Sequence, residues 1–181
     1  MRDTKPITTK SDKSLISIAG EYAVASELCR RGVYAQLTLG NRKKVDLLID
    51  GEKGFARVEV KSKQGKMWPG VKGIAPGDGP RFLVLVDLQD KGPDEKPEFY
   101  VISKDEWLPF LKQHLGDKLK SKAVKIDVDG VPHFGNSFSG TGIRTNEVAQ
   151  FKDRWDKIVH MVGTAKEPLI NSLSTRYRNV R

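Results

Sequence analysis

The amino-acid sequence predicts an α/β domain in which a central mixed β-sheet is flanked by helices. Helical and strand patterns alternate along the chain, and the apolar run FLVLVDL at residues 82–88 is typical of a strand covered on both faces. The chain has 181 residues, which suits one compact domain with its own core. We expect a single domain over residues 1–181, with a core at about 12–115, a C-terminal helix at about 145–162 and a basic tail at 164–181.

The first pattern after a polar N-terminal arm is helical. Its apolar residues recur at steps of three and four: Leu15, Ile18, Tyr22, Ala25 and Cys29. This spacing predicts a helix over residues 14–31 whose apolar stripe is buried, with Gly32 just past its C-terminus. Cys29, on that stripe, is then expected to be a buried and inert thiol. A strand is expected next, over residues 33–39.

Residues 45–61 have the pattern of a β-hairpin. Apolar and polar residues alternate on both sides of a four-residue loop, GEKG. If Asp50 and Phe55 flank that loop, Asp46 lies opposite Glu59, with Cβ atoms roughly 4.5–5.5 Å apart. Two facing carboxylates repel each other, so a divalent cation between them would stabilise the pair.

This acidic pair has a chemical use. Mg²⁺ takes oxygen ligands and is commonly held by one or two carboxylates plus substrate phosphate, and Mn²⁺ can substitute for it. Asp46 and Glu59 are the candidate ligands, and the carbonyl of Val60 can add a third oxygen. Lys61, on the same face as Glu59, is expected to orient a water and stabilise charge on a phosphate. Glu21, beside the apolar stripe of the first helix, can join the ligands directly or through water.

The stretch GKMWPGVKGIAPGDGP, residues 65–80, predicts a long loop, because it is rich in glycine and proline and has no period. It follows the proposed site closely, so we expect it to touch substrate. Lys63, Lys66 and Lys72 are candidates for phosphate contacts, with a solvated surface as the alternative. Trp68 is a candidate for stacking on a base, with packing over the sheet edge as the alternative.

The second half of the chain predicts further strands and two helices. Strands are expected at residues 99–102 and, at a sheet edge, at 123–128, with loop from 129 to 144. Ser103 and Glu106 have the spacing of a capping box, so a helix should begin there, and Pro109 should break or kink it. One apolar stripe predicts the last helix: Val148, Phe151, Trp155, Ile158 and Val162.

The amino-acid composition indicates which kinds of partner the protein binds. Lys plus Arg number 32 against 23 Asp plus Glu, which gives a net charge of +9 and favours a polyanion, most simply nucleic acid. The single cysteine excludes an intrachain disulfide, and the three histidines lack metal-ligand spacing. The N-terminus lacks an apolar signal core and no run approaches transmembrane length, so we expect a cytoplasmic protein with no membrane partner.

These motifs together resemble the PD-(D/E)XK nuclease superfamily, which includes restriction endonucleases and Holliday-junction-resolvase-like enzymes. Gly20-Glu21, Val45-Asp46 and Glu59-Val60-Lys61 carry the resemblance, over about residues 12–102. It implies a restriction-endonuclease-like core, metal ligation by Asp46 and Glu59, Lys61 as the catalytic lysine and Glu21 as an accessory acid. Gln64 occupies a place where some members carry a further active-site side chain. The chain departs from the family where Val45 replaces the motif proline, and where residues 65–80 replace a crossover helix.

The sequence therefore predicts a Mg²⁺-dependent nuclease that cuts DNA rather than RNA. The alternative is a catalytically inactive nucleic-acid-binding module of the same fold. Because Asp46, Glu59 and Lys61 are all present, the enzyme is favoured. The resemblance also implies a homodimer, since a one-domain chain that cuts both strands needs two copies.

Overall fold

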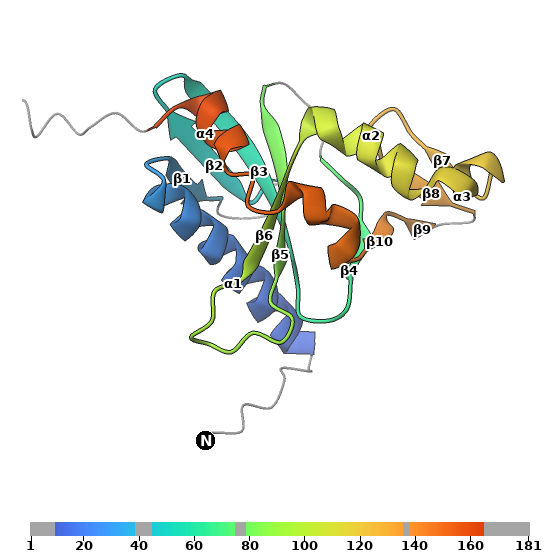
Figure 1. Cartoon of the computed structure of the whole chain (residues 1–181), viewed down its shortest axis with the longest axis horizontal. Helices are drawn as coiled ribbons and strands as arrows, with labels where there is room; N and C mark the ends of the chain where they lie inside the picture. Colours follow the sequence, from blue (N-terminus) through green and yellow to red (C-terminus); the bar gives the residue numbers. More distant parts are fainter. Residues whose placement is uncertain (1–9, 39–44, 75–78, 136–137, 165–181) are drawn as a thin grey trace, which may run out of the picture.

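The structure is a computed structural model that describes residues 10–38, 45–74, 79–135 and 138–164 (Figure 1). The helices are α1 (Lys10–Arg30), α2 (Lys104–His114), α3 (Gly116–Lys120), the 3₁₀ helix η1 (Thr145–Phe151) and α4 (Asp156–Val162). The longer strands are β1 (Tyr34–Leu37), β2 (Leu47–Gly51), β3 (Gly54–Lys63), β5 (Arg81–Asp87) and β6 (Glu98–Ser103). The shorter ones are β4 (Trp68–Val71), β7 (Val124–Ile126), β8 (Pro132–Phe134), β9 (Phe138–Ser139) and β10 (Thr141–Ile143).

The centre of the fold is a five-stranded sheet with the order β1-β2-β3-β5-β6. β3 and β5 are parallel, and the other neighbours are antiparallel, so the sheet is mixed. Figure 1 shows α1 on one side of this sheet and α2, α3 and the β7-β8-β9 sheet together on the other. The predicted fold class, a central mixed β-sheet flanked by helices, is confirmed.

Each face of the sheet has its own hydrophobic core. Val24 and Leu28 of α1 pack on one face with Val58 and Val84. The opposite core joins β4, β10, α2 and η1 to the sheet through these buried side chains: Trp68, Leu83, Leu85, Trp107, Ile143 and Phe151. β5 contributes to both cores, and its residues 82–87 are buried. The prediction that this apolar run is covered on both faces is therefore confirmed.

The helix α1 forms as predicted but turns a different face inward. Its buried positions include Gly20, Val24 and Leu28, whereas Leu15, Ile18, Tyr22 and Cys29 are exposed. The buried row runs at four-residue steps through Gly20, where an added Cβ would overlap Ser62 of β3, so the glycine permits close packing. The predictions of a buried stripe and a buried Cys29 were wrong, because spacing alone does not say which apolar face meets the sheet.

Two stretches predicted as loops contain strands. Within residues 65–80, β4 pairs antiparallel with β10, which lies within the predicted loop 129–144. β8 and β9 of the same region pair with each other, and β8 pairs with the edge strand β7. These strands are two to four residues long, and β4 and β10 are joined over a large sequence separation, so no local alternation marks them. β4 lies in the parallel crossover from β3 to β5, where the resembling family carries a helix.

The capping box before α2 is present. Glu106 Oε2 accepts hydrogen bonds from the Ser103 backbone N–H at 3.1 Å and from its hydroxyl at 2.9 Å. The helix nevertheless continues through Pro109 to His114, so the predicted break does not occur. Within the described ranges, no helix has the length and apolar character needed to cross a membrane.

The predicted C-terminal helix is two short helices. η1 ends at Phe151 and α4 begins at Asp156, and between them the chain crosses the edge of β6. Lys152 bridges to Tyr100, and the Asp153 N–H donates to the Phe99 carbonyl at 2.9 Å. All five residues of the predicted stripe are buried, but they divide between the two cores: Val148 and Phe151 in one, Trp155, Ile158 and Val162 in the other. A single helix could not reach both faces of the sheet. The predicted basic tail lies outside the described residues beyond Thr164.

Candidate active site

The hairpin has the predicted register, with Asp50 opposite Phe55 and Leu47 opposite Val58. Asp46 precedes β2 and is fixed beside β3 by its own backbone and side chain. Its N–H donates to the Val58 carbonyl at 2.9 Å, and its Oδ2 accepts from the Val60 N–H at 2.6 Å. The carboxylate of Asp46 is thus held one strand away from Glu59, next to the peptide that joins Glu59 to Val60.

Glu59 and Lys61 are side by side on the face of β3 opposite Val58 and Val60. The side chain of Glu59 is 4% exposed, and its Oε1 lies 3.0 Å from Lys61 Nζ. The Lys61 side chain is 40% exposed, so its ammonium group contacts both the buried carboxylate and solvent. A cation at this position can neutralise charge on a phosphate that approaches Glu59 from outside.

Glu21 of α1 belongs to the same electrostatic cluster. Partial burial raises its pKa, and the negative charge of Asp46 raises it further. A hydrogen bond from the Ser17 hydroxyl, at 3.3 Å, and the positive charge of Lys61 act in the opposite direction. Glu21 follows Gly20, the residue at which α1 packs closely against Ser62 of β3, and this contact brings the acid within range of both charges.

The donor set suits a hard divalent cation. Asp46 and Glu59 offer carboxylate oxygens from adjacent strands, the ligands that Mg²⁺ prefers. In the part of the chain that the structure describes, no group of three or more His, Cys, Asp or Glu side chains could hold a metal ion. Glu21, Asp46 and Glu59 are thus not brought together as a three-carboxylate group, and the fit to Mg²⁺ rests on Asp46 and Glu59, with substrate phosphate sharing the ion. The roles of Val60 and Glu21 as ligands stay predictions.

Lys63 does not lie where a phosphate could contact it. Its side chain is 1% exposed, and its Nζ is 2.6 Å from Asp87 Oδ2. The predicted phosphate contact is therefore corrected to a buried ion pair. Beyond Lys61, β3 runs beneath the crossover, so the same face of the strand changes from half-exposed at Lys61 to buried at Lys63. The alternation of apolar and polar residues in the sequence does not show this change.

Trp68 is also an interior residue. It is buried, donates from Nε1 to the Val86 carbonyl at 3.0 Å, and lies edge-on to Tyr100. Stacking on a base is thus wrong, and the alternative of packing over the sheet is correct. Lys66 and Lys72, which flank β4, are exposed, and Gln64 is half-buried just after β3 ends. Their proposed contacts stay predictions.

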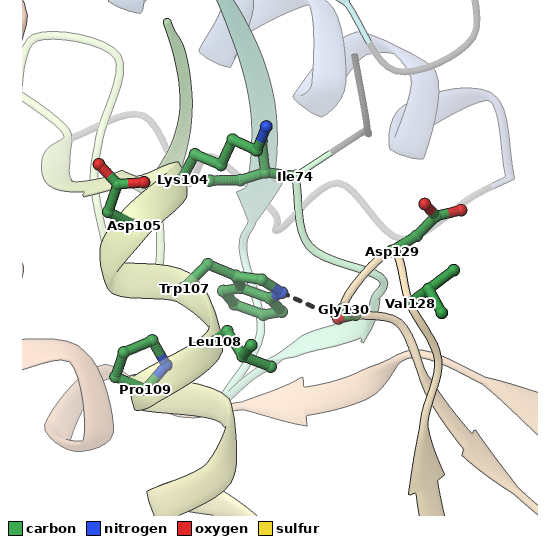
Figure 2. Close-up of a pocket in the computed structure, with 9 residues that line it drawn as sticks. All are labelled: Ile74, Lys104, Asp105, Trp107, Leu108, Pro109, Val128, Asp129 and Gly130. Carbon is green, nitrogen blue, oxygen red and sulfur yellow. Dashed lines mark hydrogen bonds between the residues drawn. The ribbon is translucent and has the colours of Figure 1, made fainter. Parts of the chain in front are cut away.

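A separate pocket of about 470 Å³ opens between α2 and the turn before β8 (Figure 2). Trp107 forms its floor and donates from Nε1 to the Gly130 carbonyl at 3.0 Å. Its rim includes Leu108, Val128 and Asp129. None of the predicted site residues lines it. The candidate active site is the cluster of Asp46, Glu59 and Lys61, at the start of β2 and on β3, rather than this pocket.

The sequence prediction omitted the remaining side chains on the face that carries Glu59. Phe55 and Arg57 precede Glu59 at two-residue steps, and Leu48 lies opposite Arg57. The hairpin register that placed Asp46 beside Glu59 also places these residues, so the signal was available. Tyr34 depends on the pairing of β1 with β2, which the hairpin pattern does not contain.

Comparison with known proteins does not identify the function of this site. No family model and no curated protein matches the chain. Among solved structures, the chain is similar to a bacterial homing endonuclease, I-Ssp6803I, with a TM-score of 0.43 and 15% identity over 82% of this chain and 92% of that one. Both values are low, so the function of this chain is inferred from its own side chains.

Proposed function

We propose that this chain is a metal-dependent nuclease that hydrolyses phosphodiester bonds, acting as a DNA endonuclease of the PD-(D/E)XK kind. The observation that carries the proposal is the juxtaposition of Asp46, Glu59 and Lys61. The Glu59 carboxylate lies 3.0 Å from the Lys61 ammonium group, and Asp46, just before the neighbouring strand, accepts a hydrogen bond from the Val60 N–H next to Glu59. The net charge of +9 favours a polyanionic substrate.

In this mechanism Asp46 and Glu59 would hold Mg²⁺, with the Val60 carbonyl as a further donor. The bound ion would supply Lewis acidity and lower the pKa of a water. Lys61 turns from Glu59 toward the scissile phosphate, orients the attacking water and stabilises the charge that develops on the phosphate oxygens. Glu21 would act as the accessory acid beside this cluster, and its partial burial and the negative charge of Asp46 raise its pKa.

A direct test is calorimetric titration with Mn²⁺ together with a plasmid cleavage assay in Mg²⁺. Asp46→Ala is expected to abolish both metal binding and cleavage. Asp117→Ala is the matched control, because Asp117 is a fully exposed acid on α3, outside the candidate site. If Asp46→Ala binds Mn²⁺ as well as the parent chain does, the metal assignment is wrong.

The second candidate is a nucleic-acid-binding module that has the fold but no activity. The close Lys61–Glu59 ion pair is the observation in its favour, since such a pair can also be purely structural. Binding of DNA by the parent chain without any cleavage in Mg²⁺ or Mn²⁺ would support this candidate over the enzyme.

A homodimer is part of the proposal, and α1 offers a surface for it. The exposed positions Leu15, Ile18, Tyr22 and Cys29, with Ala25 between them, follow the alternating three- and four-residue steps of a two-helix seam. A second copy presents the same spacing, so two such stripes could pack against each other across a two-fold axis.

A further inference from the structure

One face of the central sheet carries exposed side chains over β1, β2 and the first residues of β3. Tyr34 and Phe55 are each 57% exposed on this face, and Leu48, on the intervening strand β2, is also exposed. Their sequence neighbours Ile49 and Ala56 are buried on the opposite face, against the core beneath α1. Large apolar side chains gathered on one exposed sheet face indicate a contact surface.

The strand registers arrange this face in rows. The first row is Tyr34, Asp50 and Phe55, and the second is Gln36, Leu48 and Arg57. Alternation along β3 continues the same face to Glu59 and Lys61. Successive rows lie two residues apart, so the aromatic row is roughly 13 Å from Glu59 at about 3.3 Å per residue. The open face therefore leads to the candidate active site, where Glu59 is 4% exposed and Lys61 is 40% exposed.

The chemistry of the rows fits unpaired bases. Tyr34 and Phe55 each present an aromatic ring on which a base can stack, and the Arg57 guanidinium lies over the Phe55 ring at 5.4 Å. Gln36 and Asp50 add amide and carboxylate groups that can hydrogen-bond to base edges. Each of these side chains stands on a strand, so the spacing between them is fixed.

The width of the face favours a single strand over a duplex. Three strands at about 4.8 Å spacing, with side chains standing on all of them, form a broad flat surface. The major groove of B-DNA is about 12 Å wide and admits a two-stranded ribbon. Bases of a single strand, in contrast, can lie on an open sheet and stack on its aromatic side chains, as sheet-based RNA-binding domains bind them.

We propose that the face formed by Tyr34, Gln36, Leu48, Asp50, Phe55 and Arg57 binds unpaired bases of a single-stranded segment that leads to the scissile phosphate. The proposal depends on the nuclease function above for the identity of the partner, because the face continues into the Glu59 and Lys61 cluster. It adds a preference for nucleic acid with a single-stranded portion.

The test is fluorescence anisotropy in EDTA, with one oligonucleotide sequence offered as a single strand and as a duplex. Phe55→Ala and Tyr34→Ala are each expected to weaken single-strand binding roughly 5- to 100-fold. Phe55→Trp should retain it. Phe138→Ala is the matched control, because Phe138 is also 57% exposed but lies on β9 of a separate sheet. Circular dichroism would establish that each variant is folded.

Single-strand affinity unchanged in both alanine variants would overturn the proposal, even if the parent chain cleaves DNA in Mg²⁺. A change in molecular mass for Phe55→Ala without a change in single-strand affinity would also overturn it, by making the face a protein interface. Selective loss of single-strand binding in a chain that never cleaves would support the proposal while refuting the nuclease function. The two failures are thus distinguishable.

Discussion

Lys63 Nζ lies 2.6 Å from Asp87 Oδ2 in the protein interior, with both side chains almost fully buried. The same ammonium group donates to the Gly65 carbonyl and to Gln89 Oε1, each at 3.2 Å, and lies over the Trp68 ring. Removing one partner of a buried pair leaves the other charge without compensation. Lys63→Ala should therefore lower the free energy of unfolding by about 3–5 kcal/mol in urea denaturation.

Lys66→Ala is the control for that experiment, since Lys66 is exposed three residues later, and its effect should stay within about 0.5 kcal/mol. Equal urea midpoints for Lys63→Ala and the parent chain would show that the ion pair contributes nothing. If Lys63→Ala folds normally but binds nucleic acid more weakly, Lys63 contacts phosphate after all, despite its buried position.

Lys61 is predicted to act on turnover more than on affinity. Lys61→Ala should reduce cleavage of plasmid and oligonucleotide substrates in Mg²⁺ by about 10²-fold or more, since it removes a group that stabilises the transition state. Binding measured in Ca²⁺ should change little, because the general basic surface supplies most of the affinity. Lys120→Ala, on the exposed end of α3, is the control. Equal reductions of cleavage and binding would make Lys61 only a phosphate anchor.

Lys66 and Lys72 flank β4 and are exposed, so they remain candidates for phosphate contacts. If both lysines bind phosphates of duplex DNA, the double variant Lys66→Ala with Lys72→Ala should flatten the slope of log affinity against log salt by about 0.9 per lysine. The double variant of Lys112 and Lys125, two exposed lysines elsewhere, should leave the slope unchanged. If the first pair has no effect either, the basic residues beyond Thr164 are the next candidates.

Glu106 connects the start of α2 to the segment before α4 and should make stability depend on pH. Burial opposes its ionisation, but hydrogen bonds from Ser103 and the Arg154 guanidinium, at 2.7 Å, outweigh burial and lower its pKa. A lowered pKa contributes stability above the ordinary pKa of glutamate, and this is lost as pH falls through the folded-state value.

Glu106→Gln should thus lower stability at pH 7 by about 1–2 kcal/mol, and the difference from the parent chain should shrink as the pH falls well below the ordinary pKa of glutamate. Thermal melts of both proteins across this range would measure it. Glu52→Gln, at the exposed hairpin turn, provides the comparison. A difference that stays constant with pH would mean that charge on Glu106 is irrelevant to the fold.

The exposed stripe of α1 predicts self-association. Ile18→Glu should convert a dimer into a monomer in light-scattering measurements, because a charge in a two-helix seam is desolvated without a partner. Val128→Glu serves as the control, since Val128 is a fully exposed apolar residue in another part of the molecule. A parent chain that is monomeric at high concentration would exclude this dimer.

Local pattern was sufficient for the parts of the fold that local contacts determine. Alternation and loop length in the β2–β3 hairpin predicted its register, and that register brought Asp46 beside Glu59. Pattern failed where the outcome depends on distant partners. Which stripe of α1 is buried depends on where Gly20 meets Ser62, and β4 exists because β10 pairs with it from far along the chain. The burial of Lys63 likewise requires Asp87, which lies on the neighbouring parallel strand.

The passage of Lys152 and Asp153 along β6 has a consequence for solubility during folding and storage. An edge strand with unpaired backbone groups is a template for adding strands from other molecules, which leads to aggregation. The Asp153 N–H donates to the Phe99 carbonyl, and Lys152 forms an isolated antiparallel β-bridge with Tyr100. This edge of the sheet therefore already pairs with a segment of its own chain. The opposite edge is β1, which is only four residues long. Shortening the link between η1 and α4 would therefore be expected to promote intermolecular strand addition at β6.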